Sequence, residues 1–199
     1  MALAMEERAI RAALGPMPGI GLRTIGIKAA KLGSDPPTPC DGIILAGLAG
    51  GLNPDLGVGD VIIDLSANCP IKHPSLRSGR IYTANHLVAT TSEKQQLFHA
   101  TGCDAVDMEG TIVRQWAESA GVPMLHVRAI SDCADQAIPA NLLNWVDPVG
   151  KPHPARIAAN LALHPAQIPV MIRLGKHSRL ALGNLSVALR RIVQDRIDS

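Results

Sequence analysis

The stretch VPMLHVRAISDCAD, residues 122–135, decides the fold class of this sequence. Its first part, VPMLHVRAI, is apolar on both faces, and such a run predicts a strand that is covered on both sides of a sheet. Asp132 follows this run directly, where an unpaired carboxylate would be costly. Such an acid either finds a partner or keeps its proton, and a shielded carboxyl group acts as a general acid near neutral pH. A loop-capping aspartate is the alternative.

The alternation of strands and helices extends outward from this stretch. Short β-type runs lie at residues 21–27, 41–52, 59–67 and 80–89. SEKQQLFHATG and GTIVRQWAESAG predict helices that end at Gly102 and Gly121, with Ser92 capping the first. This order predicts an α/β fold, a three-layer α/β/α sandwich around a mixed, largely parallel sheet.

The length of 199 residues predicts a single domain, residues 1–199, with a helical C-terminal extension at 152–199. Prolines in DPVGKPHP, residues 147–154, mark off this extension because they disfavour helix at the residue before them. Within it, apolar residues recur at helical spacing, at Leu182, Leu185, Leu189, Ile192 and Val193.

Composition excludes several function classes. The net charge is +2, and the chain has only two Trp, one Tyr and one Phe, so it lacks the aromatic and basic stripe of a nucleic-acid binder. Its four cysteines form no CxxC pair, which indicates a reducing cytoplasm without disulfides. No apolar run reaches bilayer length. The scattered histidines predict no metal site.

Two further segments lie where strands are expected to end, which is where ligands bind in open α/β sheets. The glycines of AGLAGGL, residues 46–52, let backbone amides approach a ligand closely, although a tight turn would need them too. In AVDMEG, residues 105–110, Glu109 falls at the expected start of a helix, which favours its ionised form. As an alternative, Glu109 is simply an acid in the first helical turn.

Together these segments resemble the nucleoside phosphorylase and nucleosidase superfamily. Its members show a glycine-rich turn followed by Gly-Asp, a Met-Glu pair that opens a helix, and Ser-Asp after a strand. Here these motifs read GLAGGLNPDLGVGDVI, VDMEGTIV and VRAISDCAD. The resemblance implies cleavage of the bond between a purine and ribose, with Asp132 as the acid at purine N7 and Glu109 on the ribose hydroxyls. The substrate-binding residues that it implies are Met108, Ser131, Gly47, Leu48, Ala49, Gly50, Leu87 and Val88.

The attacking nucleophile stays open between water and phosphate. Leu45 and Leu48 stand where phosphorylases hold phosphate with arginine and serine. Hydrolytic members carry an N-terminal glutamate in a segment like AMEEE, where this chain has AMEER. Arg8 therefore falls on that position unless Glu7 substitutes, and we expect one of the two to serve the nucleophile or an anion. No cofactor is expected, and inorganic phosphate is the one co-substrate considered.

The C-terminal sequence HPAQIPVMIRLGKHSRLAL resembles the hopanoid-associated phosphorylases. This resemblance implies a 5′-substituted adenosine as the substrate, with adenosylhopane as the specific candidate and release of adenine as the reaction. A cationic C-terminal helix would then contact anionic lipid at a membrane surface, unless it packs its leucines on the sheet. A methylthioadenosine/S-adenosylhomocysteine-type nucleosidase and a non-catalytic nucleoside-binding relative are the alternatives. The family also implies a homo-oligomer.

Overall fold

The computed structural model describes residues 4–33, 37–64, 76–147 and 153–197. In this part of the chain a mixed sheet of six strands has the order β3-β2-β6-β1-β5-β4. Its pairings β1·β6, β2·β3 and β4·β5 are parallel, and β1·β5 and β2·β6 are antiparallel. The predicted α/β fold with a mixed sheet is confirmed. The strands are β1 (Ile43–Gly51), β2 (Val61–Asp64), β3 (Arg77–Gly79), β4 (Ile81–Thr83), β5 (Ala105–Asp107) and β6 (Met124–Asp132).

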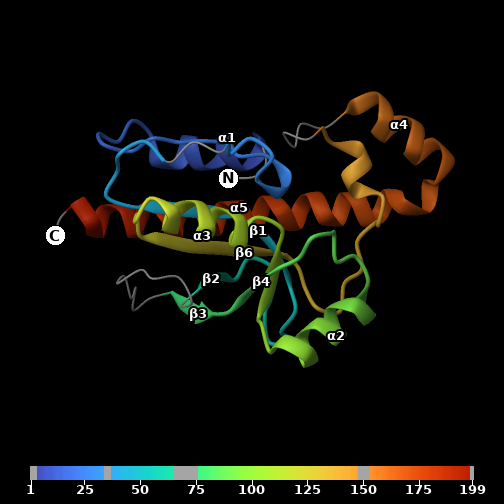
Figure 1. Ribbon diagram of the computed structural model, residues 1–199. Coiled ribbons are helices and arrows are strands. Elements are labelled where there is room, and N and C mark those ends of the chain that lie inside the picture. Colours follow the sequence, from blue (N-terminus) through green and yellow to red (C-terminus); the bar gives the residue numbers. More distant parts are fainter. Residues whose placement is uncertain (1–3, 34–36, 65–75, 148–152, 198–199) are drawn as a thin grey trace.

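Helices cover both faces of the sheet. The long helix α5 runs along one face with α1 beside it, and α3 lies on the other face (Figure 1). The α-helices are α1 (Ala4–Leu14), α2 (Thr91–Thr101), α3 (Gly110–Ser119), α4 (Pro154–Leu163) and α5 (Ile168–Ile197), and the short 3-10 helices are η1 (Ile27–Ala29), η2 (Leu142–Trp145) and η3 (Pro165–Gln167). None of the described helices is long and apolar enough to cross a bilayer.

Strand β6 is buried along its whole length and divides the core in two. Side chains alternate between the faces of a strand, so Leu125, Val127 and Ala129 point toward α1 and α5. Met124 packs with α3 on the opposite face. His126 is two positions after Met124 and therefore lies on the same face of the sheet, the face that α3 covers. Every second residue after His126 lies on this face too. This alternation places His126 and Arg128 beside Asp107 and Glu109, which precede α3.

The C-terminal helix α5 packs its leucines on the sheet. Leu185 is 0% exposed, and the same apolar cluster contains Ile10 of α1 and Val127 of β6. Of the two interpretations of the leucine pattern, the structure therefore shows the packed helix. The face of α5 that carries its leucines is a central part of the core.

Several predicted local features differ in the structure. Residues 21–27 form no strand, because positive φ angles at Gly26, Lys28 and Ala29 turn the chain into η1. The predicted strand 80–89 contributes only β4, since its partner β5 has three residues and the ladder ends at Thr83. The cap of α2 is Thr90 rather than Ser92, because the Thr90 side chain accepts the N–H of Glu93.

Candidate active site

The site is built where β1, β5 and β6 end, and the register of β1 with β6 determines it. Gly47 stands beside Arg128, and Gly50 stands beside Asp132 after an irregularity in the ladder. A Cβ atom on Gly47 would collide with Arg128 Nη1 and would lie 3.0 Å from a carboxylate oxygen of Glu6. A Cβ atom on Gly50 would lie 3.2 Å from Asp132 Oδ2. The glycines therefore leave room for two charged groups along one strand.

Arg128 is a fully buried cation held by carboxylates. Its Nη2 donates to Asp107 Oδ2 at 2.5 Å and to Glu109 Oε2 at 3.2 Å, and its Nε donates to Asp107 Oδ2 at 3.1 Å. Its Nη1 has no hydrogen-bond partner among the described residues. This N–H group lies next to Gly47 and Glu6, so it is a donor available to a ligand that enters there.

The two carboxylates on Arg128 differ in their electrostatics. Burial alone would raise the pKa of Asp107, but the Arg128 guanidinium and the His126 hydrogen bond outweigh it, so that pKa lies well below its usual range. Burial raises the pKa of Glu109, the charges of Asp107 and Glu6 add to this, and Arg128 offsets it only in part. Glu109 is the N-cap residue of α3, as predicted, but its environment opposes the ionised form that we expected the helix terminus to favour.

Asp132 finds a partner rather than standing alone at the end of β6. Lys94 of α2, 0% exposed, donates from Nζ to Asp132 Oδ2 at 2.5 Å. Ser131 Oγ donates to Asp132 Oδ1 at 2.7 Å and also contacts the carbonyl oxygen of Ala49 at 3.3 Å. The carboxylate is thus fixed at both oxygens.

The N-terminal helix contributes a different residue from the two that we predicted. Glu6 is buried, and its Oε1 accepts the N–H of Leu48 at 2.9 Å. Glu7 instead accepts hydrogen bonds from Arg11 and Thr24, and Thr24 is the main cause that lowers its pKa. Arg8 is exposed. Of the three neighbouring residues, Glu6 is therefore the one that reaches the site. It lies on the same face of α1 as the core residue Ile10.

The remaining predicted residues are partly or fully buried on or near strands β1, β4 and β5. Met108 lies between Asp107 and Glu109 in the chain and is half-buried, and Ala49 is buried beside Gly50. Val88 is buried in a small apolar cluster that includes Val106 of β5. The other three are placed as follows: Leu48 is half-buried on β1, Leu87 is half-buried in the loop after β4, and Gly47 faces Arg128.

Besides Glu6, three charged residues of the site were not predicted as site residues, although the sequence carried a signal for each of the three. Arg128 is a charged residue inside an apolar strand, where it needs partners. Lys94 stands three and four positions before Leu97 and Phe98, which places it on the inner face of its helix. Asp107 closes a three-residue apolar strand. In the described part of the chain, no group of His, Cys, Asp and Glu is arranged to hold a metal ion.

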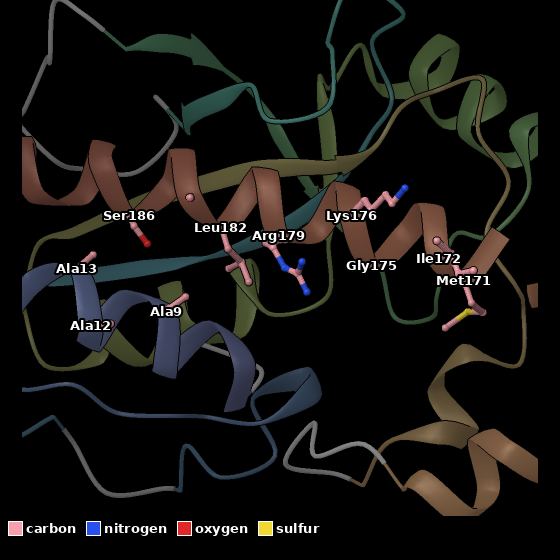
Figure 2. A pocket seen from close by; sticks show the side chains of 11 residues that line it. Ala9, Ala12, Ala13, Met171, Ile172, Gly175, Lys176, Arg179, Leu182 and Ser186 are labelled. Atoms are coloured by element: carbon pink, nitrogen blue, oxygen red, sulfur yellow. The ribbon is translucent and has the colours of Figure 1, made fainter. Parts of the chain in front are cut away.

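A second feature, the α1–α5 groove, borders the same helix as Glu6. It has a volume of about 880 Å³ and is open to solvent, and Figure 2 shows its side chains coming from two helices. Small and apolar residues dominate it, with two cations among them. Its lining is Ala9, Ala12, Ala13, Met171, Ile172, Gly175, Lys176, Arg179, Leu182, Gly183 and Ser186.

The comparison with protein families identifies the class to which this fold and site belong. The family model for the phosphorylase superfamily matches residues 64–162, a segment that includes Asp107, Glu109 and Asp132. This segment is therefore similar to the phosphorylase superfamily. No curated protein matches the chain.

Solved structures with the same fold are similar over nearly the whole chain. A 5′-methylthioadenosine/S-adenosylhomocysteine nucleosidase from Helicobacter pylori has a TM-score of 0.62 at 17% identity, covering 98% of this chain and 95% of that one. Futalosine hydrolase of the same organism has a TM-score of 0.61 at 18% identity, with the same coverage. The 5′-methylthioadenosine nucleosidase of Arabidopsis thaliana has a TM-score of 0.58 at 15% identity, covering 97% and 92%. At these identities the likeness establishes the fold.

Proposed function

We propose that this protein cleaves the N-glycosidic bond of a 5′-substituted adenosine and releases adenine. The observation that carries this proposal is the spacing of two charged groups along β1. The guanidinium of Arg128 lies against Gly47, and the carboxylate of Asp132 lies against Gly50. Three residues of strand span roughly 10 Å. A nucleoside laid along this edge would have its base at one group and its sugar at the other.

Each group has chemistry suited to one half of the nucleoside. Asp132 would bind purine N7 and make the base a better leaving group, which is a general-acid role. Glu109 would accept hydrogen bonds from the ribose hydroxyls, and its charge would stabilise the oxocarbenium-like sugar. Met108 would pack under the ribose. The strand from Gly47 to Gly50, with Ser131, Leu87 and Val88, would line the rest of the pocket.

Water is the nucleophile that the charges favour. Three carboxylates, those of Glu6, Asp107 and Glu109, act on Arg128. If all are ionised, their charges exceed that of the single guanidinium by two, and like charge repels a phosphate dianion. A neutral water meets no such repulsion. The unpartnered Nη1 of Arg128 would orient it, and Glu6 would accept its proton.

The α1–α5 groove supports an apolar 5′ substituent. Helix α1 contributes Glu6 to the site and Ala9, one helical turn away, to the groove. An apolar chain that leaves the ribose toward α1 would bury its surface among small side chains there. Adenosylhopane, with its triterpenoid substituent, is the specific substrate that we propose.

Adenine release tests this proposal directly. We would mix the protein with adenosine, methylthioadenosine and an adenosine carrying a long 5′-alkylthio chain, each with and without phosphate. Release that is independent of phosphate and greatest for the long chain is expected. Asp132→Asn should lower the rate by about 10²- to 10⁴-fold without loss of the fold. A wild-type protein that frees no adenine under any of these conditions would rule out the enzyme.

A membrane contact through the C-terminal helices follows from the same substrate. Large apolar side chains are exposed there, with Leu163 76% exposed and Ile172 56% exposed. We propose that these residues touch the lipid surface in which such a substrate is dissolved. The full chain should pellet with vesicles containing anionic lipid, and Leu163→Ser/Ile172→Ser should reduce the pelleted fraction. Light scattering after size-exclusion chromatography would show whether these residues instead support the homo-oligomer that the family implies.

A further inference from the structure

Lys94 is a buried cation that was not among the predicted site residues. An ammonium group in the interior is costly unless each of its N–H groups finds an acceptor. Lys94 Nζ donates to Asp132 Oδ2 at 2.5 Å, to the carbonyl oxygen of Cys133 at 2.8 Å and to that of Gln136 at 2.9 Å. The three donors of the ammonium are therefore all used. The Lys94 ammonium group is thereby fixed against the residue assigned to the leaving group.

This contact bears on where the leaving group's proton comes from. A carboxyl group ordinarily ionises in acid solution, whereas an alkyl ammonium keeps its proton into the alkaline range. A carboxylate alone has no proton to give at neutral pH. In the Lys94–Asp132 pair an N–H group faces the carboxylate, and the two heavy atoms are 2.5 Å apart. The pair can therefore act as a general acid through the proton of the ammonium group, whereas an ionised carboxylate by itself cannot.

We propose that Lys94 positions Asp132 and supplies the proton that Asp132 passes to the departing purine, an inference that rests on the proposed function. As the glycosidic bond breaks, its electron pair moves onto the purine, and N7 takes a proton from Asp132. Asp132 takes a proton from Lys94 Nζ, and the electron pair of that N–H bond stays on nitrogen. The attacking water forms the new bond to the sugar carbon and gives its proton to Glu6, and after adenine leaves this proton returns through solvent to the Lys94 amine.

The Met and Arg variants at this position separate proton supply from a purely structural role. Methionine removes the charge and the proton, so Asp132 must carry its own proton, as carboxyl groups do in acid solution. Arginine keeps the charge but effectively never gives up a proton. Proton supply therefore predicts that methionine works better than arginine in acid solution. A structural or purely electrostatic role predicts the opposite order.

The experiment measures adenine release from methylthioadenosine by full-length wild type, Lys94→Met, Lys94→Arg and Asp132→Asn between pH 5.5 and 8.5. The exposed neighbour Gln95→Met on the same helix is the matched control. We expect the loss of kcat caused by Lys94→Met to be at least about 10²-fold smaller at pH 5.5 than at pH 8.5, because a carboxyl group gains protons as the pH falls. Lys94→Arg should be slow at every pH, and Gln95→Met should match wild type.

The outcomes keep this inference apart from the proposed function. A Lys94→Arg variant with wild-type rates, or a Lys94→Met loss that is the same at every pH, would overturn proton supply while the enzyme assignment stands. A wild type without activity would overturn both. If Lys94→Met does not fold, as judged by thermal unfolding, Lys94→Arg decides alone: a folded but slow variant supports the inference, and a fast one overturns it.

Discussion

At the scale of single residues, Asp107 and Glu109 share one guanidinium but should affect stability with opposite signs. The pKa of Asp107 is lowered on folding, so its ionisation stabilises the fold above the usual aspartate range, and this is lost only as pH falls through the lowered value. The pKa of Glu109 is raised, so its contribution is present in acid and is lost as pH rises through the raised value. At neutral pH the ionised Glu109 is therefore a cost to the fold.

Amide substitutions should reveal this difference at pH 7. Asp107→Asn removes one partner of a buried ion pair, which costs about 3–5 kcal/mol of unfolding free energy. Glu109→Gln replaces a disfavoured charge with a neutral group, so we expect its melting temperature to rise while adenine release falls. Thermal unfolding of both variants checks this. A Glu109→Gln protein that melts below wild type at pH 7 would contradict the argument.

Gly47 should tolerate no side chain. A Cβ atom there meets the Arg128 guanidinium and the Glu6 carboxylate, so Gly47→Ala must displace the donor that faces the ligand. We expect kcat/KM for adenine release to fall by about 10²-fold or more, as when one positioned donor is removed. Gly42→Ala is the control, because a Cβ atom there lies in ordinary contact, 3.6 Å from the Pro123 carbonyl oxygen. Equal rates for the two variants would place the reaction elsewhere.

The candidate site was predictable only in part from the sequence. Asp132 and Glu109 stand at strand ends, and a strand end can be recognised locally from its apolar run and the turn that follows. Their partners could not be paired in this way, because Lys94 is 38 positions from Asp132 and Lys28, whose N–H reaches Glu109, is 81 positions away. Which oxygens meet which donors depends on the sheet register, and the register follows from packing of the whole core.

At the scale of elements, α2 offers a test of its cap. Thr90 accepts the N–H of Glu93, whereas the exposed Ser92, the second residue of the helix, was the expected cap. Thr90→Ala should therefore lower the free energy of unfolding by about 1 kcal/mol, and Ser92→Ala should leave it nearly unchanged. Urea denaturation measures both. The reverse order would show that the helix starts two residues later.

The elements that were predicted correctly are those with strong local patterns. β1 and β6 have long apolar runs, and α2 and α3 have glycines beyond their last turns, Gly102 and Gly121, both with positive φ. Residues 21–27 have the composition of a strand but no neighbouring strand to pair with. Arg23 instead donates to the carbonyl oxygens of Lys31 and Leu32 and so closes a loop. Strand pairing is a non-local property, and composition alone could not exclude it.

At the scale of the whole molecule, α5 connects elements from both ends of the chain. It contacts α1, β1, β2 and β6, and a single apolar cluster joins these five elements. Glu6 and Arg128 of the candidate site stand on two of them, α1 and β6. Loosening α5 should therefore disturb Glu6 and Arg128 even though neither residue stands on α5. Fold and activity should be lost together.

Substitutions on the two faces of α5 test this coupling. Leu185 is fully buried in the shared cluster, and Leu180 on the same helix is 53% exposed. Leu185→Ala should lower the free energy of unfolding by about 2–5 kcal/mol, because it loses burial and leaves a cavity. Leu180→Ala should change it by less than about 0.5 kcal/mol. We would measure the folded fraction and the rate of adenine release over the same range of urea concentrations. For Leu185→Ala, both should fall at a lower urea concentration than for Leu180→Ala. Equal midpoints for the two variants would mean that α5 is an appendage to the fold.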